Sequence, residues 1–416
     1  MEWKEVRLGD VCSKITDGSH YSPQAQAEGY PMLSVKDMRE YDFDFSNCKK
    51  ISDEDYKKME KDGCVSQIGD VLVAKDGSYL KEIFVCNEQR EIAILSSIAI
   101  FRPNPQLIDS RFLCYCLKSP RVYNYISLNC VSGSALPRII LKDFKGVEIQ
   151  APSLSDQRRI ASLLSSLDRK IELNNKINAD LEEMAQAVFK NWFVDFEPFK
   201  DGKFVDSELG MIPEGWKVGK ITDIDCLITD YVSNGSFASL KQNVHLYETK
   251  EYAQFIRNTD LKTNTFSVYV DKHSYDFLSK STLYGGEIII SNVGDVGSVH
   301  LCPKLDIPMT LGNNIIMLRP NEKEYNYFLY LWFKHFSGQG LIQGIKGGSA
   351  QPKFNKTDFK SLPLLIPSFE IIERSHWIFE SMFSILSSNV KENSRLSLLR
   401  DTLLPRLMSG ELEVPE

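Results

Sequence analysis

The sequence predicts a mixed α/β (α+β) fold in which two long antiparallel coiled-coil helices separate two globular domains. Two observations lead to this prediction. Landmarks in the first half of the 416-residue chain return in the same order after about 215 residues, which indicates a pseudo-twofold internal repeat. In addition, each half ends in a long stretch without glycine or proline that follows a helical pattern.

The repeat is clearest in a glycine-serine string. Gly133–Arg138 reads Gly-Ser-Ala-Leu-Pro-Arg, and Gly348–Lys353 reads Gly-Ser-Ala-Gln-Pro-Lys. The segments between the landmarks differ, since Thr16–His20 has no counterpart near Thr229–Tyr231. The halves therefore share a frame and display different surfaces on it, with neutral drift of the loops after a duplication as the alternative. Further matches are Trp3-Lys4 with Trp216-Lys217, Gly69–Val73 with Gly286–Ile290, and Pro152-Ser153 with Pro367-Ser368.

Each half has the same plan, a globular part followed by a long helix. Apolar segments predict short helices at Arg111–Leu117 and Tyr325–His335. Apolar runs bounded by turn residues predict strands at Val71–Ala74, Ile92–Phe101, Glu287–Ile290 and Asn314–Leu318. We expect globular domains at 1–152 and 198–367, a spacer helix at 153–197, and a second spacer helix with a C-terminal tail at 368–416.

The two long helices carry apolar seams with coiled-coil spacing. The first begins after Ser153–Asp156, which fits a capping box. Its seam is interrupted at Asn174 and Asn178, and the second seam is interrupted at Asn389 and Glu392. Polar steps at core positions cost stability but fix register, so we expect these four residues to face one another, unless each helix packs only on its own domain. The apolar seam residues are Ile160, Leu164, Leu167, Ile171, Leu181, Ala185 and Val188, and then Ile378, Met382, Ile385, Leu396, Leu399 and Leu403.

The composition is that of a soluble protein, with 43% hydrophobic and 25% charged residues. Met1–Val6 lacks the basic and apolar regions of a signal peptide. The longest apolar run, Ile92–Phe101, is shorter than the roughly 20 residues of a bilayer span. We therefore expect a cytoplasmic location without membrane contact. Nine cysteines without a C-x-x-C pair and six dispersed histidines favour free thiols and no metal site.

The strings that catalysis needs are missing from the sequence. An adenine methyltransferase needs an Asn/Asp-Pro-Pro-aromatic string, and Arg102–Gln106 does not match it. The glycine-rich segment Gly344–Lys353 lacks the spacing of an ATP-binding phosphate loop. No arrangement of nucleophile and base is suggested either. We therefore expect no catalytic residue and no cofactor on this chain.

Five strings together resemble the specificity subunits of type I restriction–modification systems, and they cover essentially the whole chain in that family's order. One departure is Ser368–Arg374, where no glutamine corresponds to Gln157 at the start of the first helix. The five strings are Thr16–His20, Gly69–Ser78, Phe189–Phe199, Gly210–Trp216 and Leu399–Glu411.

The resemblance implies two target-recognition domains, each of which reads one half of a bipartite, asymmetric double-stranded DNA target. It also implies that the helices dock two modification subunits, which bind S-adenosylmethionine and methylate adenine, and that restriction subunits with ATP and Mg²⁺ join the complex. Because the net charge is −7, we expect this chain alone to bind DNA weakly. Two other interpretations stay open, a combined methylase–nuclease and a coiled-coil adaptor without a DNA role.

Candidate base readers are polar residues at turns near the shared landmarks, where such side chains pair with base edges or with phosphates. Each has a solvated or structural role as its alternative. The candidates are His20, Lys75, Ser78, Tyr79 and Arg138 in the first domain, and Arg257, Asn292, Ser298 and Lys353 in the second. The predicted partner-binding residues are the apolar residues that flank the helices, namely Phe189, Trp192, Phe193, Leu403, Leu404 and Leu407.

Overall fold

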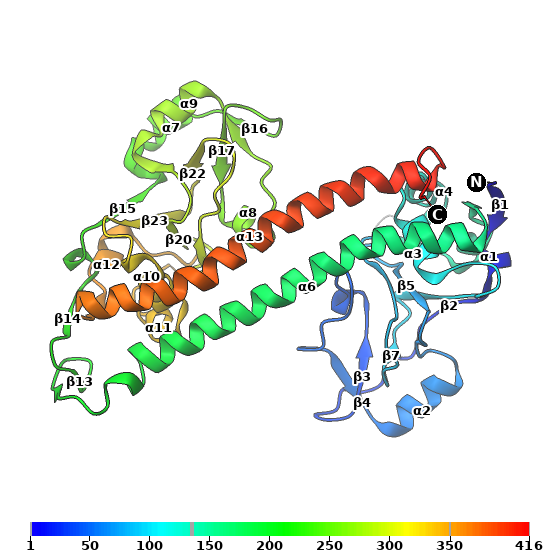
Figure 1. Cartoon of the computed structure of the whole chain (residues 1–416), viewed down its shortest axis with the longest axis horizontal. Coiled ribbons are helices and arrows are strands. Elements are labelled where there is room, and N and C mark those ends of the chain that lie inside the picture. Colours follow the sequence, from blue (N-terminus) through cyan, green and yellow to red (C-terminus); the bar gives the residue numbers. More distant parts are fainter. Residues whose placement is uncertain (1, 134–136, 349–350, 416) are drawn as a thin grey trace. The chain divides into compact units, whose positions relative to one another are not determined.

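The computed structural model describes residues 2–133, 137–348 and 351–415, so residues 134–136 and 349–350 of the repeated glycine-serine strings lie outside the described residues. The chain forms two compact units. Unit 1 consists of Met1–Asn175 with Val390–Glu416, and unit 2 consists of Lys176–Asn389. The two long helices, α6 (Leu154–Phe193) and α13 (Phe369–Met408), each contribute one half to each unit (Figure 1).

Unit 1 is built on an antiparallel four-stranded sheet with the order β2-β8-β5-β6. All four residues of the central strand β5 are buried, because its two faces are both covered. The helix α3 (Ser110–Lys118) packs against this sheet and buries Phe112–Leu117. The strands are β2 (Cys12–Asp17), β8 (Ile98–Pro103), β5 (Val71–Ala74) and β6 (Ile83–Val85), with a smaller sheet of β4 (Lys49–Ile51), β3 (Tyr30–Leu33) and β7 (Ala93–Ile94).

Unit 2 repeats this sheet in the same order and direction, β15-β23-β20-β21. The helix α10 (Tyr325–Lys334) takes the place of α3. The internal repeat predicted from the sequence is therefore confirmed by the strand topology. The strands are β15 (Cys226–Asp230), β23 (Ile315–Pro320), β20 (Ile288–Ser291) and β21 (Val299–Leu301); the second sheet contains β16 (Leu246–Tyr247), β18 (Tyr269–Val270), β17 (Ala253–Ile256), β22 (Met309–Leu311) and β19 (Thr282–Leu283).

A buried ion pair holds the same corner of both central sheets. In unit 1, the Arg102 guanidinium donates to the two oxygens of Asp70 at 2.8 Å each. In unit 2, Arg319 Nη2 donates to Glu287 Oε1 at 2.7 Å. Asp70 and Glu287 are both almost fully buried, so each carboxylate needs its arginine. The recurring Gly-Asp and Gly-Glu landmarks thus encode a shared structural pair.

One predicted strand is wrong, because Ile92–Phe101 contains two strands in two different sheets. β7 pairs in parallel with β3, whereas β8 lies in the central sheet. The chain turns between them, and Ile98 N donates to Leu95 O at 3.0 Å. Ser97 stabilises this turn, since its hydroxyl accepts a hydrogen bond from Val35 N at 3.1 Å.

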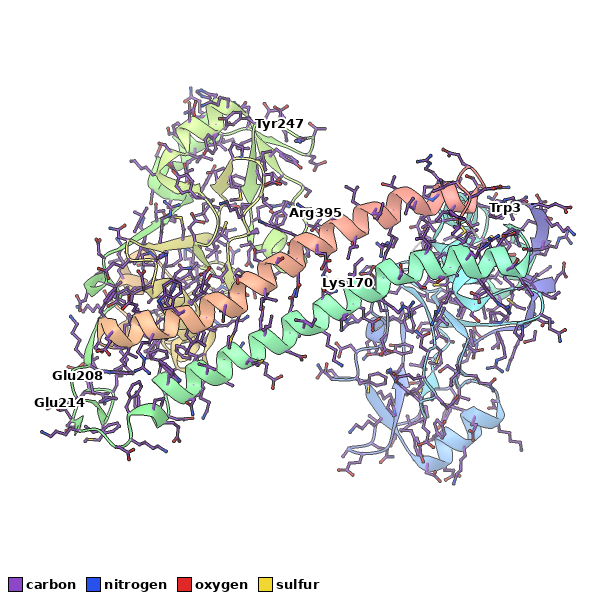
Figure 2. The ribbon with its side chains drawn as sticks, viewed as in Figure 1. Trp3, Lys170, Glu208, Glu214, Tyr247 and Arg395 are labelled. Carbon is purple, nitrogen blue, oxygen red and sulfur yellow. The ribbon has the colours of Figure 1, made fainter. Side chains whose placement is uncertain are left out.

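The helices run antiparallel within unit 1, where rising residue numbers on α6 meet falling numbers on α13. Asp168 accepts a hydrogen bond from Arg400 at 2.8 Å, and Lys170 (labelled in Figure 2) pairs with Glu392 at 3.2 Å. The predicted start of α6 is also observed, because Asp156 N donates to the Ser153 hydroxyl at 3.3 Å.

The seam predicted for the second helix is displaced at both ends. Ile385 and Leu399 are about half exposed, whereas Phe383 and Leu404 are buried. The two ends of α13 pack into the globular cores of the two units. The residues that these cores bury lie on a different face of α13 from the residues that face α6. In unit 2 the buried stripe of α13 consists of Ile372, Ser375, His376, Phe379 and Phe383.

A polar network ties both helices to the globular part of unit 1. Asp168 of α6 accepts hydrogen bonds from Tyr115 Oη at 2.5 Å and from Tyr41 Oη at 3.3 Å, in addition to the one from Arg400. Burial, followed by the nearby Asp168 charge, raises the pKa of Tyr115, so this phenol stays protonated as a donor. The orientation of the helices on this domain is therefore fixed by named hydrogen bonds as well as by apolar packing.

All nine cysteines are free thiols, and burial raises the pKa of Cys12 to about 12. No helix in the described part of the chain has both the length and the apolar character that crossing a membrane requires. In residues 2–133, 137–348 and 351–415, no three His, Cys, Asp or Glu side chains are grouped so as to hold a metal ion.

Candidate nucleic-acid interface

In unit 1, three loops meet where the central strands end. The turn after β5 begins at Lys75, the segment after β2 begins at Gly18, and β10 (Arg138–Ile139) begins at the last residue of the glycine-serine string. Gly77 N donates to Pro137 O at 2.8 Å, and Ile139 N donates to Lys75 O at 2.9 Å. These bonds bring the turn and the string together, and Gly77 has a φ of +68°, which favours glycine.

The five residues predicted for unit 1 come from these loops, but Lys75 does not point to solvent. Its side chain is only 7% exposed and pairs with Asp76 at 3.0 Å and Asp17 at 3.5 Å. The prediction that Lys75 reads bases therefore needs correction, because this ammonium is neutralised within the chain. His20 is exposed and lies 3.3 Å from Asp17, and Ser78 is exposed on the same turn as Lys75.

Tyr79 and Arg138 complete the set in unit 1. Tyr79 is partly buried against the core, so one side of its ring is committed to packing. Arg138 is exposed on β10, and its backbone forms a bridge with Asp76 of the neighbouring turn. Of the five predicted residues, His20, Ser78 and Arg138 are therefore the exposed ones.

Unit 2 presents the same frame with other side chains. Gly294 N donates to Pro352 O at 2.8 Å, and Phe354 N donates to Asn292 O at 3.1 Å. Lys353 is exposed, as Arg138 is in unit 1, and its backbone forms a bridge with Val293. The structure thus brings Asn292 and Lys353 into one loop cluster, together with the turn that carries Ser298.

Asp295 organises this cluster, and sequence reasoning missed it. Its carboxylate accepts hydrogen bonds from Ser298 Oγ at 2.5 Å and Asn258 Nδ2 at 3.0 Å, and it pairs with Lys262 at 2.6 Å. Hydrogen bonds from Lys262 and Ser298 lower the pKa of Asp295 to about 2. The internal repeat could have identified this residue. Asp295 has the same position in the turn after β20 as Ser78 has in the turn after β5.

Arg257 is held away from the role predicted for it. Its guanidinium donates to both oxygens of Asp260, at 3.0 Å from Nε and 2.6 Å from Nη2. This bidentate pair caps α8 (Asn258–Thr263) and occupies the planar donor edge that base reading requires. Asn258 and Lys262 of α8 contact the loop cluster instead, because both bind the Asp295 carboxylate.

The apolar residues predicted to bind partners are largely used inside the chain. Phe189 and Phe193 are 1% exposed in the core of unit 2, and Leu404 and Leu407 are buried in the core of unit 1. Trp192 is partly buried below the Arg374 guanidinium, and Leu403 also packs against the core. The prediction is therefore wrong for the four buried side chains, because the chain's own domains cover them.

Asparagine pairs occupy the middle of the helices. In unit 1, Asn174 Nδ2 donates to Glu392 Oε2 and to Asn393 Oδ1, both at 2.8 Å. In unit 2, Asn389 Nδ2 donates to Asn178 Oδ1 at 2.9 Å. Asn393 was not identified from the sequence, although the repeat of about 215 residues aligns it with Asn178. The hydrogen bond from Asn174, followed by the one from Lys170, lowers the pKa of Glu392.

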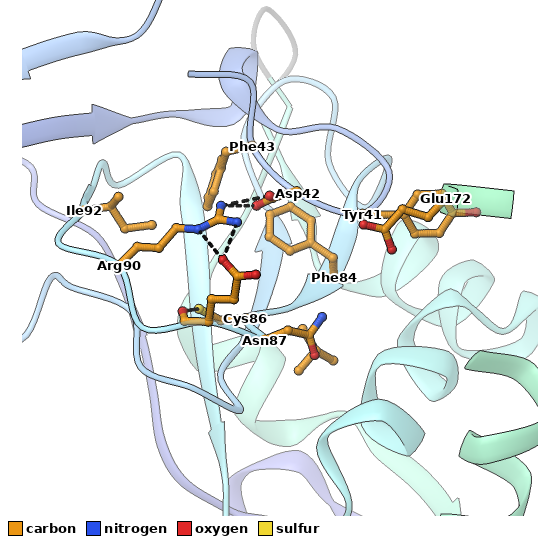
Figure 3. A pocket seen from close by; sticks show the side chains of 11 residues that line it. Tyr41, Asp42, Phe43, Phe84, Cys86, Asn87, Arg90, Ile92 and Glu172 are labelled. Carbon is orange, nitrogen blue, oxygen red and sulfur yellow. Dashed lines mark hydrogen bonds and ion pairs between the residues drawn. The ribbon is translucent and has the colours of Figure 1, made fainter. Parts of the chain in front are cut away.

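A hollow in unit 1 is lined by Tyr41, Phe84 and Glu172, with Arg90 at its side (Figure 3). The Arg90 guanidinium donates to the two Asp42 oxygens at 2.7 and 2.8 Å and to Glu88 at 3.0 Å. The Arg90 charge is thus balanced by the chain's own carboxylates, and its ion pair with Asp42 joins two loops of unit 1.

Comparison with known proteins agrees with this architecture. The chain matches the family model of the type I restriction modification DNA specificity domain over residues 1–183 and again over 213–395. It is 25% identical to the type I restriction enzyme HindI specificity subunit of Haemophilus influenzae, over 99% of this chain and 100% of that one. It is 31% identical to the MjaIX specificity subunit of Methanocaldococcus jannaschii, over 74% and 70% of the two chains.

The fold is similar to that of a solved S subunit of a type I restriction–modification system from M. genitalium, with a TM-score of 0.59, 16% identity, and coverage of 98% and 96%. Two copies of one α/β domain, each with its own polar loop face and each packed on one half of both long helices, define a protein with two recognition domains. The chain belongs to the type I restriction–modification DNA specificity family and is a specificity subunit. This family supplies specificity and is non-catalytic.

Proposed function

We propose that this chain reads a bipartite, asymmetric double-stranded DNA target, with the loop face of one unit on each half-site. The observation that carries the proposal is the difference between two faces built on one frame. In unit 1 Ser78 follows the turn glycine Gly77, whereas in unit 2 Asp295, which accepts hydrogen bonds from Ser298 and Asn258, follows the equivalent Gly294. A protein that distinguishes two half-sequences needs different base-contacting groups in a common orientation. Residues 1–152 and 198–367 serve as the recognition domains, and 153–197 and 368–416 as the spacers.

The chemistry resides on partner subunits in this proposal. Two modification subunits bind S-adenosylmethionine and methylate adenine, and restriction subunits use ATP and Mg²⁺ to cut unmodified DNA. The names of the relatives, type I restriction enzyme specificity subunits, support a place in such an assembly. The assembly acts in the cytoplasm as a phage defence, and this chain contributes no catalytic group.

Docking of the modification subunits is assigned to exposed apolar residues of the helices in place of the buried ones. Trp377 of α13 is 64% exposed and Met184 of α6 is 53% exposed in unit 2, and Leu398 is 70% exposed in unit 1. Exposed aromatic anchors of this kind often contribute 2 kcal/mol or more to an interface. Trp377→Ala should weaken assembly at least tenfold in ultracentrifugation without changing the melting temperature. Trp192→Ala is the contrast, because that ring packs internally and its loss should lower the melting temperature.

A methylation assay with exchanged domains tests the function. Residues 1–152 are replaced by the matching domain of a relative with a different target, and methylated sites are mapped by sequencing in cells that also express the modification subunit. One half of the target should change and the other should stay. A change in both halves contradicts the proposal.

The same assay separates the other two interpretations. Methylation by the purified chain without a modification subunit would establish a combined methylase. Methylation that requires the partner but ignores this chain's identity would establish an adaptor without a DNA role. The proposal requires methylation that depends on the partner and has a target set by this chain.

A further inference from the structure

The position of Arg138 in unit 1 is the same as that of Lys353 in unit 2. In both units a glycine of the turn after the central strand donates to the proline before the cation, Gly77 N to Pro137 O and Gly294 N to Pro352 O, at 2.8 Å in each case. In both units the residue after the cation donates to the first residue of that turn, at 2.9 and 3.1 Å. The backbone that carries the cation is therefore fixed in the same way twice.

The two cations are also available in the same way. Arg138 and Lys353 are both exposed, and no carboxylate in the described parts of the chain pairs with either side chain. This sets them apart from Lys75, which is buried between carboxylates, and from Arg257, which is held by Asp260. Among the predicted cations, only this equivalent pair has its charge free for a ligand.

The groups beside these cations differ between the units. The residue that opens the turn is Lys75 in unit 1 and Asn292 in unit 2, and the exposed residue after the turn glycine is Ser78 in one and Asp295 in the other. A position that keeps its charge and backbone while its neighbours change cannot distinguish two half-sites by itself. It suits the group that every DNA sequence presents at the same place, which is the backbone phosphate.

We propose that Arg138 and Lys353 are phosphate-positioning residues that orient each recognition domain on DNA, and that the variable residues around them read the bases. This inference rests on the proposed function and assigns a role within the same face. An arginine in one unit and a lysine in the other fits a point-charge contact with phosphate. A contact that uses the planar fork of arginine on a guanine edge would not tolerate that exchange equally well, because lysine lacks the fork.

The test uses the full-length chain assembled with its modification subunits. Fluorescence anisotropy measures binding to the duplex that the wild-type complex methylates and to a scrambled duplex, between 50 and 200 mM salt. Arg138→Gln should weaken binding to both duplexes by the same factor. It should also reduce the slope of log affinity against log salt by about one. Lys353→Gln should give the same result for the other unit.

Exchange variants keep the test informative if a glutamine variant folds poorly. Arg138→Lys and Lys353→Arg should retain the salt slope and the methylated sequence. Lys217→Gln removes an exposed charge from β14 (Lys217–Lys220) and controls for net charge, so it should leave the slope unchanged. A loss confined to the methylated duplex would make Arg138 a base reader and overturn the proposal, as would an unchanged slope in both glutamine variants. If the wild-type complex prefers neither duplex, the proposed function itself fails.

Discussion

Asp168 and Arg400 form a hydrogen-bonded ion pair at 2.8 Å between the two helices of unit 1, with both side chains less than a fifth exposed. The residues 215 positions away, Phe383 and Ala185, belong to the apolar core of unit 2. Phe383 stacks on Tyr327 there, with ring centroids 4.8 Å apart. The repeat therefore fills one position with an ion pair in one unit and with an aromatic stack in the other.

The ion pair should matter most when only one partner is removed. Asp168→Ala leaves the partly buried Arg400 charge with only the more exposed carboxylates of Glu40 and Asp401. Arg400→Ala leaves the buried Asp168 charge without its cation. Each change should lower the free energy of unfolding by about 3 kcal/mol. The double variant should lose much less than the sum, which urea unfolding in a double-mutant cycle measures. Arg395→Ala, an exposed change on the same helix, should stay within about 0.5 kcal/mol of wild type.

The same network predicts an alkaline dependence of stability. Burial raises the pKa of Tyr115 above its ordinary value of 10.0, so the unfolded chain releases this proton first as pH rises. The stabilisation is complete below about pH 10 and is lost as pH rises toward the folded-state pKa. Tyr115→Phe should make the free energy of unfolding less steep above pH 10, by up to about 1.4 kcal/mol per pH unit. The exposed Tyr123 gives the matched control, and equal slopes for Tyr115→Phe and wild type would refute the assignment.

Lys75 should behave as a structural residue of the recognition face. Lys75→Met places the Asp17 and Asp76 carboxylates side by side without their cation, which should cost about 3 kcal/mol of stability. Adding Asp76→Asn should recover part of that loss, as measured by thermal unfolding. Ser78→Ala on the same turn should leave stability within about 0.5 kcal/mol of wild type. If the Lys75→Met protein is as stable as wild type, the structural role is wrong and Lys75 is again a candidate for DNA contact.

The length of the helices is predicted to set the gap between the half-sites. Seven residues inserted near Asn178 alone would break the match with α13, whereas one heptad in each helix should preserve the seam. The double insertion adds roughly 10 Å, or about three base pairs. Methylome sequencing should then find unchanged half-sequences with a wider gap, or no methylation because the DNA phase has rotated. Methylation of the original target with its original gap would rule out this role.

Some elements were predicted correctly, because residues close together in the sequence determine them. Val71–Ala74 is a strand as predicted, since four apolar residues between turn residues fit a central strand. The positions Asn174 and Asn178 were identifiable because a polar residue interrupts an apolar period. The buried face of α13 could not be identified from the sequence. Phe383 and Ile385 are both apolar, and only packing against the globular core buries Phe383 and leaves Ile385 half exposed.

Whether a candidate site residue is exposed or buried depends on residues far away in the sequence. For this reason the sequence alone assigned the wrong role to several of them. Lys75 is buried because Asp17, on another strand, lies within 3.5 Å. Phe189 is in the core because α10 covers it, with Phe328 packed at 6.0 Å between ring centroids. An apolar flank on a helix looks the same in sequence whether its own domain or a partner covers it. The free cations Arg138 and Lys353 were found because the repeat itself aligns them.

The asparagine pairs at the centre of the helices are self-complementary. Asn174 meets Asn393 and Asn178 meets Asn389, and each pair is the other shifted by 215 residues. A helix with asparagines four residues apart therefore offers an antiparallel copy of itself the same donors and acceptors. Two separate chains of half this length, each with such a helix, would meet through the same central contact in a symmetric dimer. The pair Asp168–Arg400 lacks this symmetry, because Phe383 and Ala185 stand at the equivalent positions of unit 2.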